Sequence, residues 1–259
     1  MKRFLASRSM FITTTPKPST TMLARAELVA ERCCVSFVRR GGSLPALMEE
    51  QQSRLVYVVR RDHDELRLGD TTLFVHPGMV VLKRATGRRH PFLRALLLHG
   101  PCSEIVDATI GLGADALHAA TELGVDVRGI EGSPVVFSLL EEGLGRLSAE
   151  ASDFGRGAAK IRAELGGATE ALRRMKSASA DVVTIDPMFD TPRPAAHGFE
   201  LLRKVAHTAE PPAPLLAEAR RVARTHVVLK YPKRSTYPEC DACVDGKAVR
   251  YLIYDATPR

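Results

Sequence analysis

The chain has 259 residues, of which 45% are hydrophobic and 26% charged, and basic residues exceed acidic ones by seven. This length permits one large domain or two small ones, and no run approaches the ~18 apolar residues of a membrane span, so we expect no membrane partner. Five cysteines, an odd number, are too few for a disulfide scaffold, and we expect a cytoplasmic protein.

The basic excess lies entirely in the amino-terminal third of the chain. Residues 1–95 contain 17 lysines and arginines against 8 acidic residues, whereas residues 96–259 contain 20 against 22. A solvated basic surface is the simpler interpretation, but the nearly neutral remainder favours an appended module that binds a polyanion. We predict a small basic α/β domain at 1–95 that binds RNA, with phosphate contacts from Arg39, Arg40, Arg60, Arg61, Lys83, Arg84, Arg88 and Arg89.

Strands and helices are expected to alternate in this first domain. We predict strands at 10–14, 34–38 and 55–59, a helix from Thr20 or Thr21 to about Arg32, a second helix at 43–51 capped by Ser43, and a hairpin of 65–68 with 72–75. Residues 11–19 and 38–44 faintly resemble the Brix/Imp4-type RNA-binding domains of ribosome assembly factors. Residues 76–90 are the expected connection to the second domain, with His76 beside Pro77 as a turn residue.

The most informative stretch opens the second domain, at 96–259. A short apolar run ends in Asp107, and a turn with Gly111 and Gly113 leads into a segment of helical periodicity. The two glycines permit a sharp turn and a close approach of a ligand. Eighteen residues beyond Gly113, the next apolar run ends in Glu131, where a carboxylate can accept hydrogen bonds from ribose hydroxyls. A lone G-x-G is usually only a loop, but D-x-x-x-G-x-G followed by an acidic strand end is typical of class I S-adenosyl-L-methionine (SAM) methyltransferases.

The rest of the second domain alternates strands and helices as a doubly wound sheet requires. Strands are predicted at about 104–108, 126–130, 160–164, 181–185, 226–230 and 248–254, and helices begin near Asp115, Pro134, Thr169, Phe199 and Pro214. The last strand alternates like an antiparallel edge strand beside the fifth. The fold class is therefore α/β, a Rossmann-like class I methyltransferase sheet preceded by the small basic domain.

A second acidic strand end follows the loop by about 75 residues, in Asp186-Pro187-Met188-Phe189. Alone, it would be a strand stopped by a proline, which has no N–H to donate. In this position, amino-group methyltransferases carry Asp/Asn-Pro-Pro-Tyr/Phe. A carboxylate and a carbonyl can hold the N–H groups of an amine, and an aromatic ring can stack on the base. We assign catalysis to Asp186, Pro187, Met188 and Phe189.

Several segments together resemble one family. They are 107–116, Glu131-Gly132-Ser133-Pro134-Val135-Val136, Leu139-Leu140-Glu141-Glu142-Gly143-Leu144, Asp186-Pro187-Met188-Phe189 and Val227-Val228-Leu229-Lys230-Tyr231-Pro232. In this order they resemble the RsmJ-type methyltransferases of 16S ribosomal RNA, over roughly residues 100 to 255. The resemblance implies SAM as cofactor, the N2 amine of a guanine as substrate, and ribosomal RNA or the small ribosomal subunit as partner.

Two segments depart from the family pattern. The third strand ends in Gly166-Gly167-Ala168 instead of an acidic residue before an alanine, so no adenine contact is assigned. The residues after Phe189 read Asp190-Thr191-Pro192-Arg193, which is less basic than expected. We assign Lys230 to RNA and the cofactor to Asp107, Thr109, Gly111, Gly113, Asp115, Glu131, Gly132 and Ser133.

Three hypotheses on function follow from these patterns. The first is methylation of a guanine amine in 16S rRNA, and the second is methylation of another RNA, DNA or a small amine. The third is a non-catalytic SAM-binding RNA chaperone, against which the Asp186 tetrapeptide argues, because a pure binder needs no group that orients an amine. Cys240-x-x-Cys243 could be half of a zinc site, but no second pair stands near it, so no metal is expected.

Overall fold

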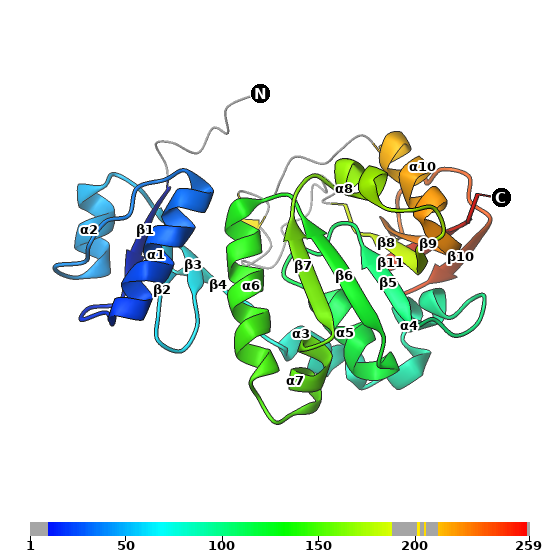
Figure 1. Cartoon of the computed structure of the whole chain (residues 1–259), viewed down its shortest axis with the longest axis horizontal. Helices are drawn as coiled ribbons and strands as arrows, with labels where there is room; N and C mark the ends of the chain where they lie inside the picture. Colours follow the sequence, from blue (N-terminus) through cyan, green and yellow to red (C-terminus); the bar gives the residue numbers. More distant parts are fainter. Residues whose placement is uncertain (1–9, 188–200, 203–204, 206–211, 258–259) are drawn as a thin grey trace.

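The computed structural model describes residues 10–187, 201–202, 205 and 212–257. Within these residues the strands form two sheets, which lie side by side with helix α6 (Pro134–Ser148) between them (Figure 1). Met188, Phe189 and the helix predicted near Phe199 lie outside the described residues. Among the helices of the described ranges, none has both the length and the apolar character that crossing a membrane requires.

The first sheet has the strand order β1-β2-β3-β4. Its parallel pair is β1 (Met10–Thr14) with β2 (Leu55–Val59), and the predicted hairpin is β3 (Glu65–Leu68) with β4 (Thr71–Leu73). Side chains alternate along β1, so that Ile12 packs toward helix α1 (Thr20–Cys33) and Phe11 toward helix α2 (Leu44–Glu50). The sheet is therefore covered by one helix on each face.

Two details of this first sheet differ from the prediction. Ser19, rather than Thr20 or Thr21, caps α1, because its hydroxyl accepts the N–H of Met22 at 3.2 Å. The strand expected at 34–38 is wrong. Cys34 has a left-handed backbone that ends α1, and only Phe37 forms an isolated bridge with the first strand. Ser43 caps α2 as predicted, by accepting the N–H of Ala46.

The connection between the sheets is helical. It contains α3 (Gly78–Arg84), the 3₁₀ turn η1 (Gly87–Arg89) and α4 (Pro91–Leu96). The Nδ1 of His76 accepts the N–H of Gly78 at 2.9 Å, which confirms His76 as a turn residue. Val80 is buried while Val81 and Leu82 are exposed, so α3 packs only one side against the protein.

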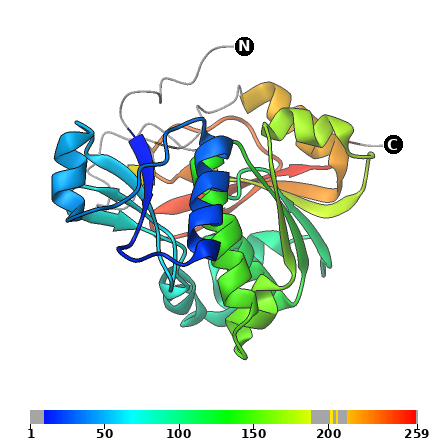
Figure 2. The same cartoon turned by 60° about the vertical axis from the view of Figure 1, so that its left-hand side comes forward.

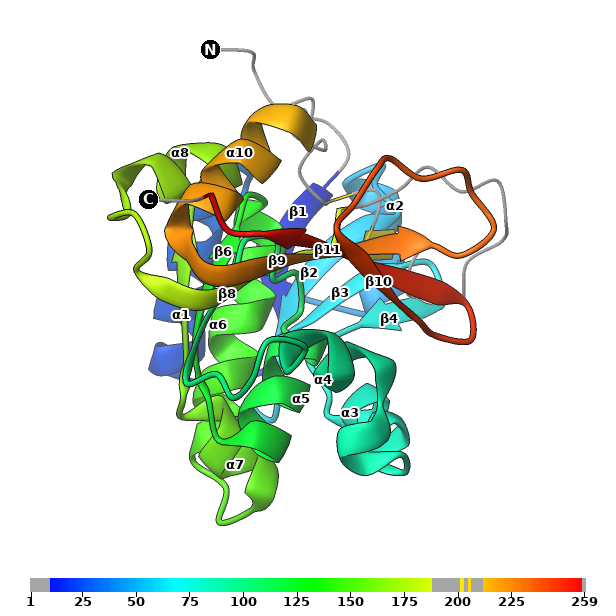
Figure 3. The ribbon, with the colours of Figure 1, turned by 90° about the vertical axis from the view of Figure 1, so that its right-hand side faces the viewer.

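The second sheet has the strand order β10-β11-β9-β8-β5-β6-β7 (Figure 3). Strands β5 (Glu104–Asp107), β6 (Asp126–Glu131), β7 (Ile161–Leu165), β8 (Ala180–Ile185) and β9 (Ala223–Pro232) are parallel. β11 (Val249–Asp255) is antiparallel to β9, as predicted. It is not the edge strand, however, because β10 (Ala242–Asp245) pairs with its outer side. Residues 251–254 are accordingly all buried.

Helices cover both faces of this second sheet. One face packs against α4, α5 (Ala114–Leu123), α6 and α7 (Asp153–Ala158), and the other against α8 (Ala168–Arg174) and α10 (Pro212–Val222). The alternation of Ile105 and Val106 on β5 illustrates the division, since each belongs to a different hydrophobic cluster. The crossovers bring the carboxyl ends of β5, β6 and β8 to one edge.

The small sheet is joined to the large one by a shared hydrophobic cluster. Ile12, Tyr57 and Leu66 of the small sheet pack with Val136 and Leu139 of α6. Figure 2 shows α1 lying along α6, where Arg32 pairs with Glu141 at 2.9 Å. The two predicted domains therefore bury apolar surface against each other, and the boundary at residue 95 stays a prediction.

Candidate functional site

The loop between β5 and α5 is held by its own carboxylate. Asp107 is buried at the end of β5, and its Oδ1 accepts the N–H of Thr109 at 3.2 Å. Gly111 and Gly113 both have positive φ, of 57° and 76°, as the expected turn requires. A Cβ on Gly113 would lie 2.9 Å from the terminal carbon of Leu140, so the loop also approaches α6 closely.

Glu131, at the end of β6, closes the other side of this loop. Its Oε2 accepts the N–H of Gly111 at 3.1 Å and its Oε1 accepts the N–H of Ser133 at 2.7 Å. Only 7% of Glu131 is exposed. Ser133, which follows Gly132, caps α6 and donates its hydroxyl to the carbonyl of Val205. The two predicted strand ends, β5 and β6, are thus joined through one carboxylate.

The second predicted acidic strand end lies beside the same loop. β8 is hydrogen-bonded to β5, and the backbone N–H of Asp186 donates to the hydroxyl of Thr109 at 2.7 Å. The order of the strands thus brings Asp107, Thr109 and Asp186 together, although 77 residues separate the last two in sequence. Pro187 follows directly and Met188 and Phe189 are not described.

Two lysines and two aspartates form a continuous ionic chain at this edge. Lys230 Nζ, near the end of β9, donates to Asp186 Oδ2 at 2.6 Å and to Asp115 Oδ2 at 3.1 Å. Asp115, in the first turn of α5, also accepts from Lys83 Nζ of α3. We call Lys83, Asp115, Lys230 and Asp186 the lysine–aspartate chain. The sequence gave these four residues three separate roles, and no local pattern predicts their contact.

Burial and charge shift the pKa values of this group in opposite directions. Burial raises the pKa of Asp107 to about 7, with the N–H of Thr109 opposing the shift and neighbouring carboxylates adding to it. Burial also opposes ionisation of Asp115, but Lys230 and Lys83 outweigh it and lower the pKa of Asp115. Burial raises the pKa of Asp186, and Lys230 limits the rise. Burial favours neutral Lys230, yet Asp115 and Asp186 raise its pKa.

The basic residues predicted to contact RNA fall into two groups. Four are exposed and have no carboxylate partner among the described residues: Arg39, Arg61, Arg88 and Arg89. The others have partners within the chain, since Arg60 pairs with Asp62 and Glu65, Arg84 pairs with Glu122 and Asp153, and Arg40 donates to the carbonyl of Gly42. Lys83 and Lys230 belong to the lysine–aspartate chain rather than to an open basic surface.

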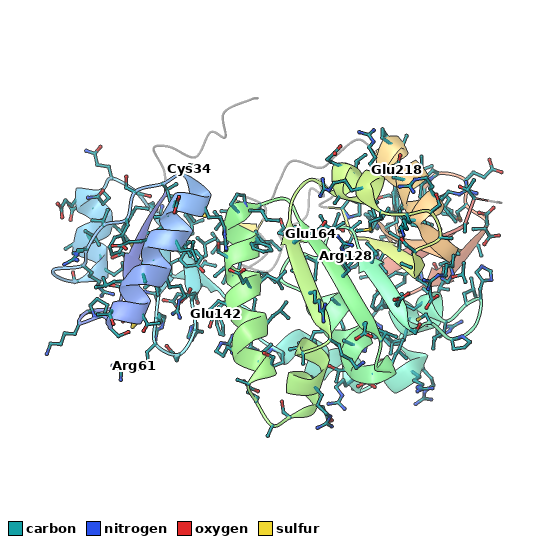
Figure 4. All side chains as sticks on the ribbon, in the orientation of Figure 1. Cys34, Arg61, Arg128, Glu142, Glu164 and Glu218 are labelled. Carbon is teal, nitrogen blue, oxygen red and sulfur yellow. The ribbon has the colours of Figure 1, made fainter. Side chains whose placement is uncertain are left out.

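A hollow of about 590 Å³ lies at the opposite, amino-terminal ends of β5, β6 and β7. Arg128 and Glu164, labelled in Figure 4, line it and pair with each other at 2.8 Å. No group of three or more metal-binding side chains occurs in the ranges that the structure describes, and all five cysteines are free thiols.

The site residues fit the cofactor that the motifs predict. Glu131 presents a buried carboxylate, an acceptor suited to ribose hydroxyls, and the glycine turn leaves the backbone of the loop free of side chains at two positions. The parallel strands, the glycine loop and the acidic strand ends define a class I SAM-dependent methyltransferase.

Comparisons with known proteins agree with this class. The sequence matches the SAM_MT family of SAM-dependent methyltransferases over residues 46–256. The solved SAM-dependent methyltransferase NGO1261 from Neisseria gonorrhoeae has the same fold, with a TM-score of 0.69, 20% identity, and coverage of 95% of this chain and 96% of that one. The chain is also 28% identical over 225 residues to YpiP of Bacillus subtilis, covering 85% of this chain and 87% of that protein.

Several curated relatives carry the name ribosomal RNA small subunit methyltransferase J. The protein from Halorhodospira halophila is 36% identical over 180 residues, covering 66% of this chain and 67% of that protein. The one from Rhodopseudomonas palustris is 34% identical over 182 residues, covering 67% and 81%. The chain belongs to the SAM-dependent methyltransferase family, as an RsmJ-type member whose cofactor is SAM. Alignments with these J-type relatives span 57% to 81% of the relatives' length.

Proposed function

We propose that this enzyme methylates the exocyclic N2 amine of a guanine in 16S ribosomal RNA. The observation that carries the proposal is the position of Asp186, whose backbone is hydrogen-bonded to the cofactor loop through Thr109. The names of the J-type relatives support the small-subunit ribosomal RNA as substrate. Such a substrate would place the enzyme with the ribosomes in the cytoplasm.

The roles of the residues follow from the weakness of the nucleophile. The lone pair of an exocyclic amine is delocalised into the ring, so it must be aimed to react. SAM, when bound, supplies an electrophilic methyl group on a sulfonium. Asp186 accepts hydrogen bonds from the amine and orients its lone pair, while Asp107 and Glu131 keep the cofactor loop in shape. Orientation and exclusion of water then account for most of the catalysis, and no strong general base is needed.

The substrate must also be opened for the enzyme to reach its target. Guanine N2 lies in the shallow minor groove of an RNA helix, so the base has to leave its stack. We assign delivery of the RNA to the basic residues of 1–95. Arg39 and Arg61 on the small sheet, with Arg88 and Arg89 beside α3, are the exposed cations available to phosphates.

Mass spectrometry of ribosomal RNA tests this function. RNA from cells that lack the protein should lose one methylated guanine of 16S rRNA, and the wild-type chain should restore it. Asp186→Asn should not restore it, while calorimetry should show SAM affinity within a few-fold of wild type. Asp126→Asn is a matched control, because that side chain is 70% exposed and remote from the loop. Full methylation by Asp186→Asn, or methylation of a different RNA by the wild type, would contradict the proposal.

A further inference from the structure

The Asp186 carboxylate has a single partner among the described residues. That partner is Lys230, and 44% of the Asp186 side chain remains exposed. Asp186 is therefore the open end of the lysine–aspartate chain, whereas the side chains of Asp115 and Lys83 are only 16% and 17% exposed. One carboxylate oxygen is occupied by an ammonium group, and the other is available to an incoming donor.

Lys230 is in turn fixed from the other side. Asp115 holds it from α5, and Lys83 reaches Asp115 from α3, so the last turn of α3 in the connecting segment bears on a residue at the end of β9. A lysine side chain has four rotatable bonds, and two carboxylates on different elements remove most of that freedom. Lys230 is thereby a fixed cation and not a mobile surface charge.

We propose that Lys230 is a positioning residue, which fixes the Asp186 carboxylate in place and in its charged form, and that Asp115 and Lys83 hold Lys230 for this task. The proposal rests on the proposed function, because it makes Asp186 the acceptor for the amine. It gives Lys83, Asp115 and Lys230 one common role in place of separate roles in binding RNA and cofactor.

The charges around Asp186 show why the cation is needed. The groups that face it are the carboxylates of Asp107 and Asp115, the ammonium groups of Lys230 and Lys83, and the hydroxyl of Tyr251, whose pKa burial raises. Without Lys230, three neighbouring carboxylates would share one lysine. Asp186 would then bind a proton near neutral pH, and a protonated carboxyl group cannot accept the N–H groups of an amine equally well on both oxygens.

The test is a titration of Asp186 in the full-length protein. Aspartate carboxyl carbons are labelled with ¹³C, and the Asp186 signal is assigned by its loss in Asp186→Asn. In Lys230→Met the midpoint of this signal should rise by about one to three pH units. Lys230→Arg should keep it near the wild-type value, and Lys83→Met should give a smaller rise. Lys160→Met, whose partner Asp126 is remote and exposed, should leave it unchanged.

The same variants are then compared in methyl transfer to small ribosomal subunits. The acidic limb of the pH profile should move upward in Lys230→Met by the amount that the Asp186 signal moves. An unchanged Asp186 midpoint in both Lys230→Met and Lys83→Met would overturn the inference. Because the titration needs no substrate, it separates this outcome from a failure of the proposed function, in which the wild type itself would not methylate the subunits.

Discussion

Replacing Glu131 by glutamine is the sharpest test of how the cofactor loop is held. The carboxylate accepts two backbone N–H groups, from Gly111 at 3.1 Å and from Ser133 at 2.7 Å. A glutamine has one carbonyl oxygen, so it can keep one of these bonds, and its NH₂ group then faces the other N–H. The substitution preserves volume and removes one charge-assisted hydrogen bond.

The magnitude follows from that lost bond. A hydrogen bond to a charged group contributes about 1.5–3 kcal/mol, and each 1.4 kcal/mol is about a tenfold change in affinity. We expect Glu131→Gln to bind SAM about 10- to 100-fold more weakly. Part of the loss also falls on the unliganded protein, because the N–H of Gly111 is left without its acceptor. At about 2–4 °C per kcal/mol for a chain near this size, its unfolding midpoint should drop by about 3–12 °C.

Calorimetric titration with SAM and thermal unfolding measure the two effects. Glu141→Gln is the matched control, since that glutamate lies on α6, is 54% exposed and pairs only with Arg32. An exposed ion pair contributes about 0–1 kcal/mol, so the control should bind SAM like the wild type. Wild-type affinity in Glu131→Gln would refute the assignment of Glu131 to the cofactor site.

Three further predictions concern stability, pH and RNA. Gly113→Ala forces a Cβ into a positive φ and should cost about 1–2 kcal/mol in urea unfolding, whereas Gly145→Ala, with open space around it, should be neutral or stabilising. Since folding raises the pKa of Asp107 from 3.8 to about 7, its contribution to stability is full below pH 4 and is lost as the pH rises through 7. Asp107→Asn should therefore gain on the wild type between pH 4 and 8 in thermal unfolding, and parallel curves would contradict this. Arg39→Ala with Arg61→Ala should weaken RNA binding and flatten its dependence on the logarithm of salt by about 0.7 per lost phosphate contact, with SAM affinity unchanged; an unaltered slope would remove these arginines from the RNA surface.

Secondary structure was predicted well where local signals were strong. The strands of the parallel sheet were found within a few residues, because buried β-branched runs end in turns or acids. The four-residue β10 was missed because 242–245 is short and lacks a clear hydrophobic run. The helix α3 was expected as a plain connection, since the stretch of 76–90 is interrupted by Pro77 and Gly78. The strand at 34–38 failed because its only pairing is a single bridge.

The sequence by itself determined the cofactor loop and the acidic strand ends. Asp107, Gly111, Gly113 and Glu131 lie within 25 residues, and their roles depend on local backbone geometry and on the rule that parallel strands end at one edge. Local patterns of this kind are written into consecutive residues, so no knowledge of the packing was needed to find them.

Only the tertiary structure decided which charges meet. The contacts of the lysine–aspartate chain join residues 32, 115 and 44 positions apart in sequence. Lysines on open surfaces and lysines that hold a buried carboxylate have the same local sequence character, because what distinguishes them is the element packed opposite. The crossovers that place α3, α5 and β9 at one edge of the sheet turn Lys83 and Lys230 from expected phosphate ligands into partners of Asp115 and Asp186.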